Sequence, residues 1–292
     1  MLKKTIINHK LNSIYNDSTE KSIYYRLYEE YSIYGNCLKD TERSIITVEP
    51  KGSQLDIYTK HYGYYKLEQI IDKIIFSLLR YGRAFLILNM DKTQMSADRE
   101  CEQQETNKLF IEEKKGILIK DRFNTYHFWY LLFGKDDPKE LVVTKDNIIE
   151  FDIHELGYSR HYFNDVVKKL DKYNILKIGD FVLDPPNGYD YSVHSKNNRM
   201  MQLKITKEIG WLPLSNDISA SYNIYRGIKQ RQVQVELLRY VVDKFNNGIE
   251  LFFHEKDVGK IVTNLRAINY EQLWDDYSKG VITTHQLMEQ LY

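Results

Sequence analysis

The amino-acid sequence predicts a mixed α+β fold: a mixed or antiparallel β region flanked by helices, then a long helix and a small helical C-terminal part. Three observations support this class. Apolar side chains in residues 64–81 recur at the three- and four-residue spacing of a helix. The following segment, to about residue 200, carries mostly strand signals. Residues 216–250 contain no proline, and as one helix of about 30 residues they would form a rod of roughly 45 Å.

Residues 1–60 are predicted to form the first of three parts, an N-terminal helical or irregular segment. Within it, the stretch "STEKSIYYRLYEEYSIYG" indicates a helix that is capped by Ser18 and closed by Gly35. Leu27 and Tyr31 lie on its apolar face.

Residues 61–211 are predicted to form the second part, an α+β domain with hairpins. It begins with the helix of residues 64–81, and Gly82 stands where a helix C-cap glycine belongs. "RAFLILNM" follows as a buried strand. "KLFIEEKKGILIKD" predicts a hairpin, because a Lys-Gly pair separates its two apolar runs.

The rest of this second part predicts more strands and one helix. "NTYHFWYLLFG" and "ELVVT" flank the turn "GKDDPK", and "DNIIEFDI" predicts another strand. "HYFNDVVKKLDKY" predicts a helix inserted after these strands. A Pro-Pro-Asn-Gly turn stops the next segment, and "RMMQLKITKEIGW" predicts extended structure again.

Residues 212–292 are predicted to form the third part, which begins with the long helix and ends in a terminal strand and helices. After the long helix we expect a strand at "IELFF" and a helix near residues 257–265. Two short helices, "NYEQLWDDYSKG" and "TTHQLMEQLY", complete the prediction.

The long helix carries an apolar seam of the coiled-coil type. Its positions at alternating steps of four and three are Ile224, Ile228, Arg231, Val235, Leu238, Val242 and Phe245. Basic and glutamine side chains occupy the remaining surface, at Arg226, Lys229, Gln230, Gln232, Gln234 and Arg239. This pattern fits an ordinary core helix with a solvated polar face, or a rod whose other sides meet a neighbouring subunit. Since a buried arginine needs a partner, we expect a carboxylate near Arg231 on a neighbouring helix or subunit.

The composition favours no bulk attraction to nucleic acid. Of 292 residues, 41 are Lys or Arg and 41 are Asp or Glu, so any DNA contact must be local. The 24 tyrosines fit either a biased coding composition or surfaces that meet other proteins. Cys37 and Cys101 make no metal or disulfide framework. Without an apolar signal segment or a run of ~20 apolar residues, we expect a protein of the cell interior or one assembled there.

No motif predicts an enzyme, and we expect no catalytic residue, cofactor or metal. "HELGYSRH" spaces its histidines by seven residues, whereas a zinc-protease helix needs four. Asp91, Glu112 and Lys114 resemble a strand-borne nuclease set that holds Mg²⁺. Charged residues are also common where a hairpin turns into solvent, and this explanation accounts for the three residues equally well.

The order of four segments resembles the bacteriophage portal protein family. A helix runs into "LLRYGRAFLIL", which has that family's "YG.AF" pattern, and "DNIIEF" has its "D.II.F" pattern. A long helix follows, and "KGVITTHQL" resembles the "G.IT...L" segment near the end of the portal core. The matching stretches are residues 78–88, 146–158, 215–245 and 277–291. The resemblance implies that residues 61–211 form a wing-like domain and that residues 212–292 form a stem-like or channel-like region.

The resemblance implies a non-enzymatic function in the virion, after assembly in the host cytoplasm. A dodecameric ring of this chain would stand at one capsid vertex, in contact with capsid protein and with no membrane. Double-stranded DNA would pass through it, and the terminase large subunit and head-completion or adaptor proteins would dock on it. The long-helix residues Arg226, Lys229, Arg231, Gln232 and Arg239 would then line the channel or a subunit interface. Arg80 and Arg83 would make a subunit contact or an ordinary salt bridge.

Two departures from the portal pattern leave alternatives open. The chain is short for a portal, and only residues 175–211 could supply the clip that grips terminase. A nucleic-acid-binding protein of a mobile element would use the basic helix in a DNA groove. A metal-dependent nuclease of the phage-defence type would use Glu112.

Overall fold

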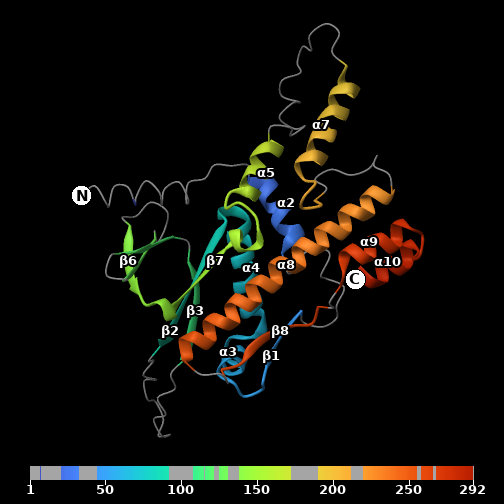
Figure 1. Ribbon diagram of the computed structural model, residues 1–292. Helices are drawn as coiled ribbons and strands as arrows, with labels where there is room; N and C mark the ends of the chain where they lie inside the picture. The colour runs from blue at the N-terminus through green and yellow to red at the C-terminus, as the bar shows by residue number, and fades with distance from the viewer. Residues whose placement is uncertain are drawn as a thin grey trace, which may run out of the picture.

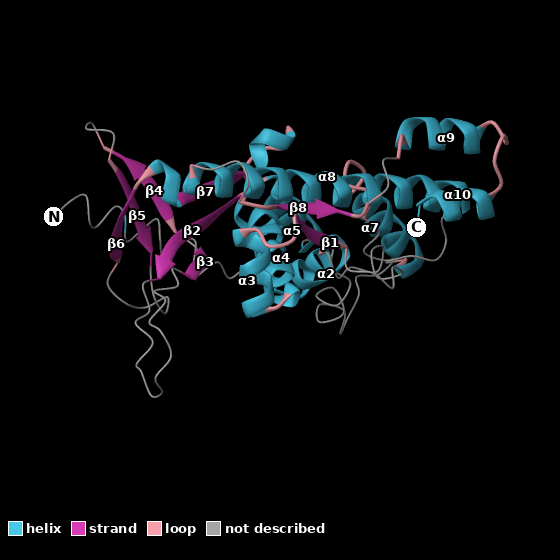
Figure 2. Ribbon diagram, turned by 90° about the horizontal axis from the view of Figure 1, so that it is seen from below, coloured by secondary structure: helices cyan, strands magenta, loops and turns pink. Residues whose placement is uncertain are grey.

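The long helix α8 (Ala220–Phe253) crosses the whole molecule, with β-sheets at one end and a pair of short helices at the other (Figures 1 and 2). The protein is represented by a computed structural model. It describes residues 7, 21–32, 45–91, 108–114, 116–121, 125–130, 138–171, 190–211, 220–254, 258–265 and 268–291. The predicted class is confirmed: a helix-flanked antiparallel β region precedes the long helix and a small helical end.

Helix α4 (Tyr64–Tyr81) and strand β2 (Arg83–Asp91) lie where the sequence predicts them. Gly82 between them is left-handed, with φ 72°, and its N–H donates to the Leu78 carbonyl at 2.9 Å. Only a residue without Cβ fits here, because a Cβ would stand 1.9 Å from the carbonyl oxygen of Arg160. The helix therefore turns directly into the central strand of a sheet.

Two antiparallel three-stranded sheets make up the β region. The first has the order β3 (Lys108–Lys114), β2, β7 (Ile148–Asp152). The second has the order β4 (Ile117–Lys120), β5 (Tyr126–Tyr130), β6 (Lys139–Val143).

The predicted hairpin between residues 108 and 121 is wrong, since β3 pairs with β2 and β4 pairs with β5. The chain changes sheets at Gly116, which lies so close to β5 that a Cβ would be 2.4 Å from the Trp129 carbonyl oxygen. The fully buried ring of Phe128 joins the two sheets by packing 5.2 Å from the ring of Phe85.

A small two-stranded sheet joins a segment early in the chain to a segment near its C-terminal end. Strand β1 (Ile46–Glu49) pairs antiparallel with β8 (Lys260–Thr263), with Val48 opposite Ile261. The predicted helix near residues 257–265 is therefore wrong, because the β-branched run of β8 finds an extended partner more than 200 residues earlier. Asn246 of α8 fixes this strand by exchanging hydrogen bonds of 2.8 and 2.9 Å with the Ile261 main chain.

Two further predictions of extended structure are wrong. "RMMQLKITKEIGW" begins inside helix α7 (Tyr191–Ile205), whose N-terminus is capped by the carboxylate of Asp190. "IELFF" forms the last turns of α8, where Ile249 continues the buried row from Phe245 at a spacing of four.

Among the described residues, helix α3 (Gln54–Tyr62), which follows Ser53, was not predicted. The predicted helices include α2 (Lys21–Tyr31), α5 (Tyr162–Asp171), α9 (Tyr270–Ser278) and α10 (Thr284–Leu291). Ser18 and Gly35, the expected ends of α2, lie outside the described residues, as does the Pro-Pro-Asn-Gly turn.

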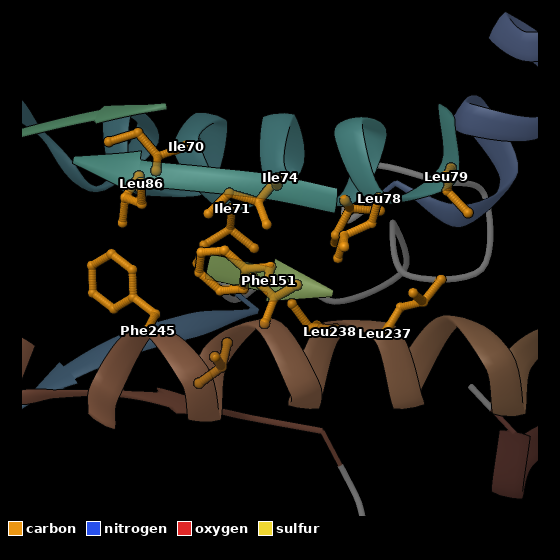
Figure 3. Packing of buried hydrophobic residues seen from close by; sticks show 14 of the residues in the cluster. Ile70, Ile71, Ile74, Leu78, Leu79, Leu86, Phe151, Leu237, Leu238 and Phe245 are labelled. Atoms are coloured by element: carbon orange, nitrogen blue, oxygen red, sulfur yellow. The ribbon is translucent and has the colours of Figure 1, made fainter. Parts of the chain in front are cut away.

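The main core lies between α4, β2, β7 and α8 (Figure 3). Ile71 and Ile74 of α4 point toward Phe151 of β7, and Leu238 and Phe245 of α8 close the layer from the other side. Buried residues of this cluster come from all three predicted parts of the chain. The expected boundaries at residues 61 and 212 stay predictions. Within the described residues, no helix is long and apolar enough to span a membrane.

Candidate interaction surfaces

Helix α8 carries five of the seven residues for which we predicted a role, and it packs on more than one side. Every position of the predicted seam is buried except Ile224, which is half-buried. Positions off the seam are also buried, among them Arg226, Val233, Gln234 and Leu237. The helix is therefore a central element of its own chain, and only a narrow stripe of it is free for other molecules.

Arg226 is fully buried, and its guanidinium holds α7 and the following turn against α8. Its Nη1 donates to the Leu203 carbonyl at 3.0 Å and to the Tyr222 hydroxyl at 3.3 Å. Its Nη2 donates to the Trp211 carbonyl at 2.7 Å and to the Thr206 hydroxyl. An arginine fork suits several fixed acceptors at once. In this chain it acts inside the fold, so we do not retain it as a channel residue.

Arg231 is 6% exposed and belongs to a polar chain that leads to α2. Its Nη1 donates to Gln234 Oε1 at 3.2 Å, and the Gln234 amide donates to the Ser32 carbonyl at 3.0 Å. Burial raises the pKa of the nearby Tyr270 hydroxyl, and the positive charges of Arg231 and Arg239 oppose that rise. The expected carboxylate partner of Arg231 stays a prediction.

The outer stripe of α8 carries both signs of charge. Lys229, Gln232 and Arg239 are half-exposed on it, and Glu236 and Asp243 are exposed between and beyond them. Lys229 Nζ donates to Gln232 Oε1 at 3.3 Å, and the Gln232 amide donates to Glu236 Oε1 at 2.8 Å. With Arg226 and Arg231 buried, this helix offers no continuous basic surface to a DNA groove.

The junction of α4, β2 and β7 collects charged groups around Asp152. Oδ2 of this carboxylate accepts from Arg160 Nε at 2.9 Å and from Arg83 Nε at 3.3 Å. Its Oδ1 accepts from the main-chain N–H of His154 at 3.0 Å. Burial alone would raise the pKa of Asp152, but the hydrogen bonds from Arg160 and His154 and the charge of Arg83 outweigh it, so the pKa is lowered.

The two arginines at Gly82 have different surroundings. Arg83 makes an intrachain ion pair, with Asp152 at 3.3 Å and Glu150 at 3.5 Å. The Arg80 guanidinium lies 5.3 Å from the ring centroid of Tyr81, beside the sheet junction. A salt bridge therefore accounts for Arg83, and a subunit contact at either residue stays a prediction.

The strand register separates the residues of the nuclease alternative. Asp91 lies opposite Lys108, whereas Glu112 lies opposite Ile87, four positions earlier along β2. At about 3.3 Å per residue this places the two positions roughly 13 Å apart along the ladder, too far to share one ion. Lys114 Nζ lies over the Tyr130 ring, 4.4 Å from its centroid. Among the described residues, no three His, Cys, Asp or Glu side chains could hold a metal ion.

Sequence reasoning missed Asp152, Arg160 and Tyr240, which connect β7 to the rest of the fold. Tyr240 Oη accepts from the Asp152 N–H at 2.8 Å and donates to its carbonyl at 3.0 Å. The one signal in the sequence that could have identified this group was Asp152, an acidic residue at the end of the apolar strand "DNIIEFD". Its arginine partner on β2 stands 69 residues away.

No model of a known protein family matches the sequence, and no curated protein matches it.

Proposed function

We propose that this chain is the subunit of a short bacteriophage portal: a ring at a capsid vertex through which double-stranded DNA is packaged and ejected. The observation that carries the proposal is the pairing of β2 with β7. These strands hold the "YG.AF" and "D.II.F" segments, which lie more than 60 residues apart. Arg83 stands opposite Asp152, and Ala84 opposite Phe151. The portal-like motifs therefore meet in one structural unit.

The long helix supports the same proposal. Its 34 residues correspond to a rod of about 51 Å. Its C-terminal half packs on the sheet that carries both motifs, and its N-terminal half packs on α9 and α10. The "G.IT...L" segment forms the turn between these two helices and the start of α10. A helix of this length can connect the outer wing of a portal subunit to the wall of the central channel.

The stripe of Lys229, Gln232 and Arg239 is our proposed contact with the channel or with a neighbouring subunit. Its mixed charge suits a conduit, because DNA that must slide cannot be held by many phosphate contacts, each of which adds affinity through counterion release. The partners we propose are those of a portal: terminase large subunit, head-completion or adaptor proteins, and capsid protein. Of the expected clip, residues 175–189 lie outside the described residues, and residues 190–211 form α7 with the turn that follows it.

Negative-stain imaging of the purified chain, combined with two DNA assays, tests this proposal. We expect ring-shaped particles with a central hole, weak duplex binding and no cleavage. A monomer or dimer that binds DNA with a steep salt dependence would instead support the mobile-element alternative. Mg²⁺-dependent cleavage that Glu112→Ala abolishes would support the nuclease.

A further inference from the structure

Helix α7 presents apolar side chains to the outside as well as to its own chain, where Leu203 is buried and Ile205 packs on the main core. Its outer stripe contains Val193, Lys196, Met200 and Lys204, all exposed, with Met200 60% accessible. Its inner stripe is largely polar: Asn198, Gln202 and the following Thr206 are buried. An amphipathic helix that packs only within its own chain has the opposite arrangement. The outer stripe of α7 is therefore a partly apolar surface that the chain itself leaves exposed.

A second exposed apolar surface lies on the pair formed by α9 and α10. Leu273 and Leu287 hold this pair against Ile228 of α8 in a cluster of their own. Beyond that contact, Val281 is 68% exposed and Met288 42% exposed. The outer surface of the α9–α10 pair thus offers apolar side chains that nothing in the described part of the chain covers.

The two surfaces carry opposite charge. The outer stripe of α7 carries Lys196 and Lys204, and residues 191–205 contain no acidic residue; the half-buried Arg199 lies off this stripe. Residues 270–291 contain four acidic residues (Glu271, Asp275, Asp276 and Glu289) and one lysine, giving −3 from 1 minus 4. Pairing either surface with itself would therefore oppose like charges, whereas pairing one with the other joins unlike charges.

Helix α7 and the α9–α10 pair lie on opposite sides of α8 (Figures 1 and 2). Arg226 contacts α7 and its following turn, and Ile228 contacts the α9–α10 pair. At 3.6 residues per turn, positions two apart point about 200° apart around a helix. One chain therefore cannot bring its own α7 stripe onto its own α9–α10 pair.

We infer that the outer stripe of α7 in one copy packs on the α9–α10 pair of the next copy. The contact is heterologous, so it leaves an unused surface at each end and repeats from subunit to subunit. Met200, Met288, Val193 and Val281 form its apolar centre. Lys196 and Lys204 face the acids of the neighbour at the rim. This inference rests on the proposed ring and names the surfaces that close it.

Disulfide trapping tests this contact in the full chain, with Cys37 and Cys101 replaced by serine. The double variant Met200→Cys/Met288→Cys is assembled and oxidised, and its products are separated without reductant. We expect a ladder of dimers, trimers and larger species, and only monomers from each single variant. Val142→Cys/Met288→Cys is the matched control, because Val142 is 62% exposed on β6 at the far end of the molecule; we expect no ladder from it.

Each other outcome overturns a defined part of the inference. Ring-sized particles without a ladder would mean that other surfaces close the ring, which leaves the proposed function standing. Dimers from Met200→Cys alone would show that α7 meets itself. A chain that stays monomeric, by light scattering before oxidation and on the gel after it, would remove both the contact and the ring.

Discussion

Tyr240 and Asp152 form a reciprocal pair, in which one hydroxyl accepts from the N–H and donates to the carbonyl of the same residue, at 2.8 and 3.0 Å. This contact fixes the long helix to the last residue of β7. Because the Asp152 side chain also holds Arg83 and Arg160, one residue ties together α8, β2 and the loop after β7.

Tyr240→Phe should lower the free energy of unfolding by about 1–3 kcal/mol, since it leaves the main chain of Asp152 without its partner. Urea denaturation followed by circular dichroism measures the change. Tyr62→Phe, at a ring that is 42% exposed, is the control and should have little effect. Equal midpoints for both variants would show that the pair does not stabilise the fold.

Arg226→Met should destabilise the protein by about 3 kcal/mol or more, because buried acceptors on Leu203 and Trp211 lose their donors. Arg226→Lys should recover only part of this, since an ammonium cannot reach all the acceptors in the geometry of the guanidinium fork. Lys229→Met, on the outer stripe, should change the stability by less than about 0.5 kcal/mol. Thermal unfolding ranks the three variants, and a stable Arg226→Met protein would refute the structural role.

Two glycines of α8 should respond to alanine with opposite signs. A Cβ on Gly227 meets nothing within 4 Å, so Gly227→Ala should stabilise by about 0.5–1 kcal/mol through helix propensity. A Cβ on Gly248 would stand 2.2 Å from Ile149 Cδ1, so Gly248→Ala should destabilise by about 1–3 kcal/mol through overpacking. Denaturant midpoints that move in the same direction would contradict this packing of α8 on β7.

Acid should weaken the junction at Asp152. Its pKa is lowered in the fold, so its ionised form contributes stability that is fully present above the unfolded pKa of about 3.9. That contribution is lost as the pH falls through the lowered folded pKa. Asp152→Asn should therefore be less stable than the parent at pH 6, and the gap should shrink toward pH 2–3. A gap that stays constant with pH would contradict this account.

Reversing the charge of the α7 stripe should weaken assembly, and reversing the charge of the α9–α10 pair as well should restore it. Lys196→Glu/Lys204→Glu should shift sedimentation toward monomers at low salt, because the stripe would then face an acidic neighbour. Adding Asp276→Lys and Glu289→Lys to the same chain should restore association. If the first variant assembles like the parent, these lysines do not lie at the contact.

Local periodicity was enough to predict α4, and a glycine at the right position predicted its left-handed end. Strand β8 could not be predicted in this way, because its partner β1 lies at the other end of the chain. Only the C-terminal part of α7, from residue 199, was predicted as extended; there "MMQLKI" places apolar residues next to one another, a pattern that fits neither period well. Its inward polar face, with Asn198 and Gln202, follows from tertiary contacts alone.

The candidate surfaces were predicted only in part. A seam of seven positions was expected on α8, but packing on further sides also buries Arg226. Periodicity had placed this residue on the outside, because a single sequence does not reveal how many elements surround a helix. Likewise, an ion pair such as that between Arg83 and Asp152 depends on strand register, which is set by the whole sheet.

The mass of the purified protein in solution tests the central claim most directly. Multi-angle light scattering at moderate salt should give one species of about a dozen subunits, the closed ring that a heterologous contact builds. A monomer or dimer that persists as the protein concentration rises would contradict the portal proposal.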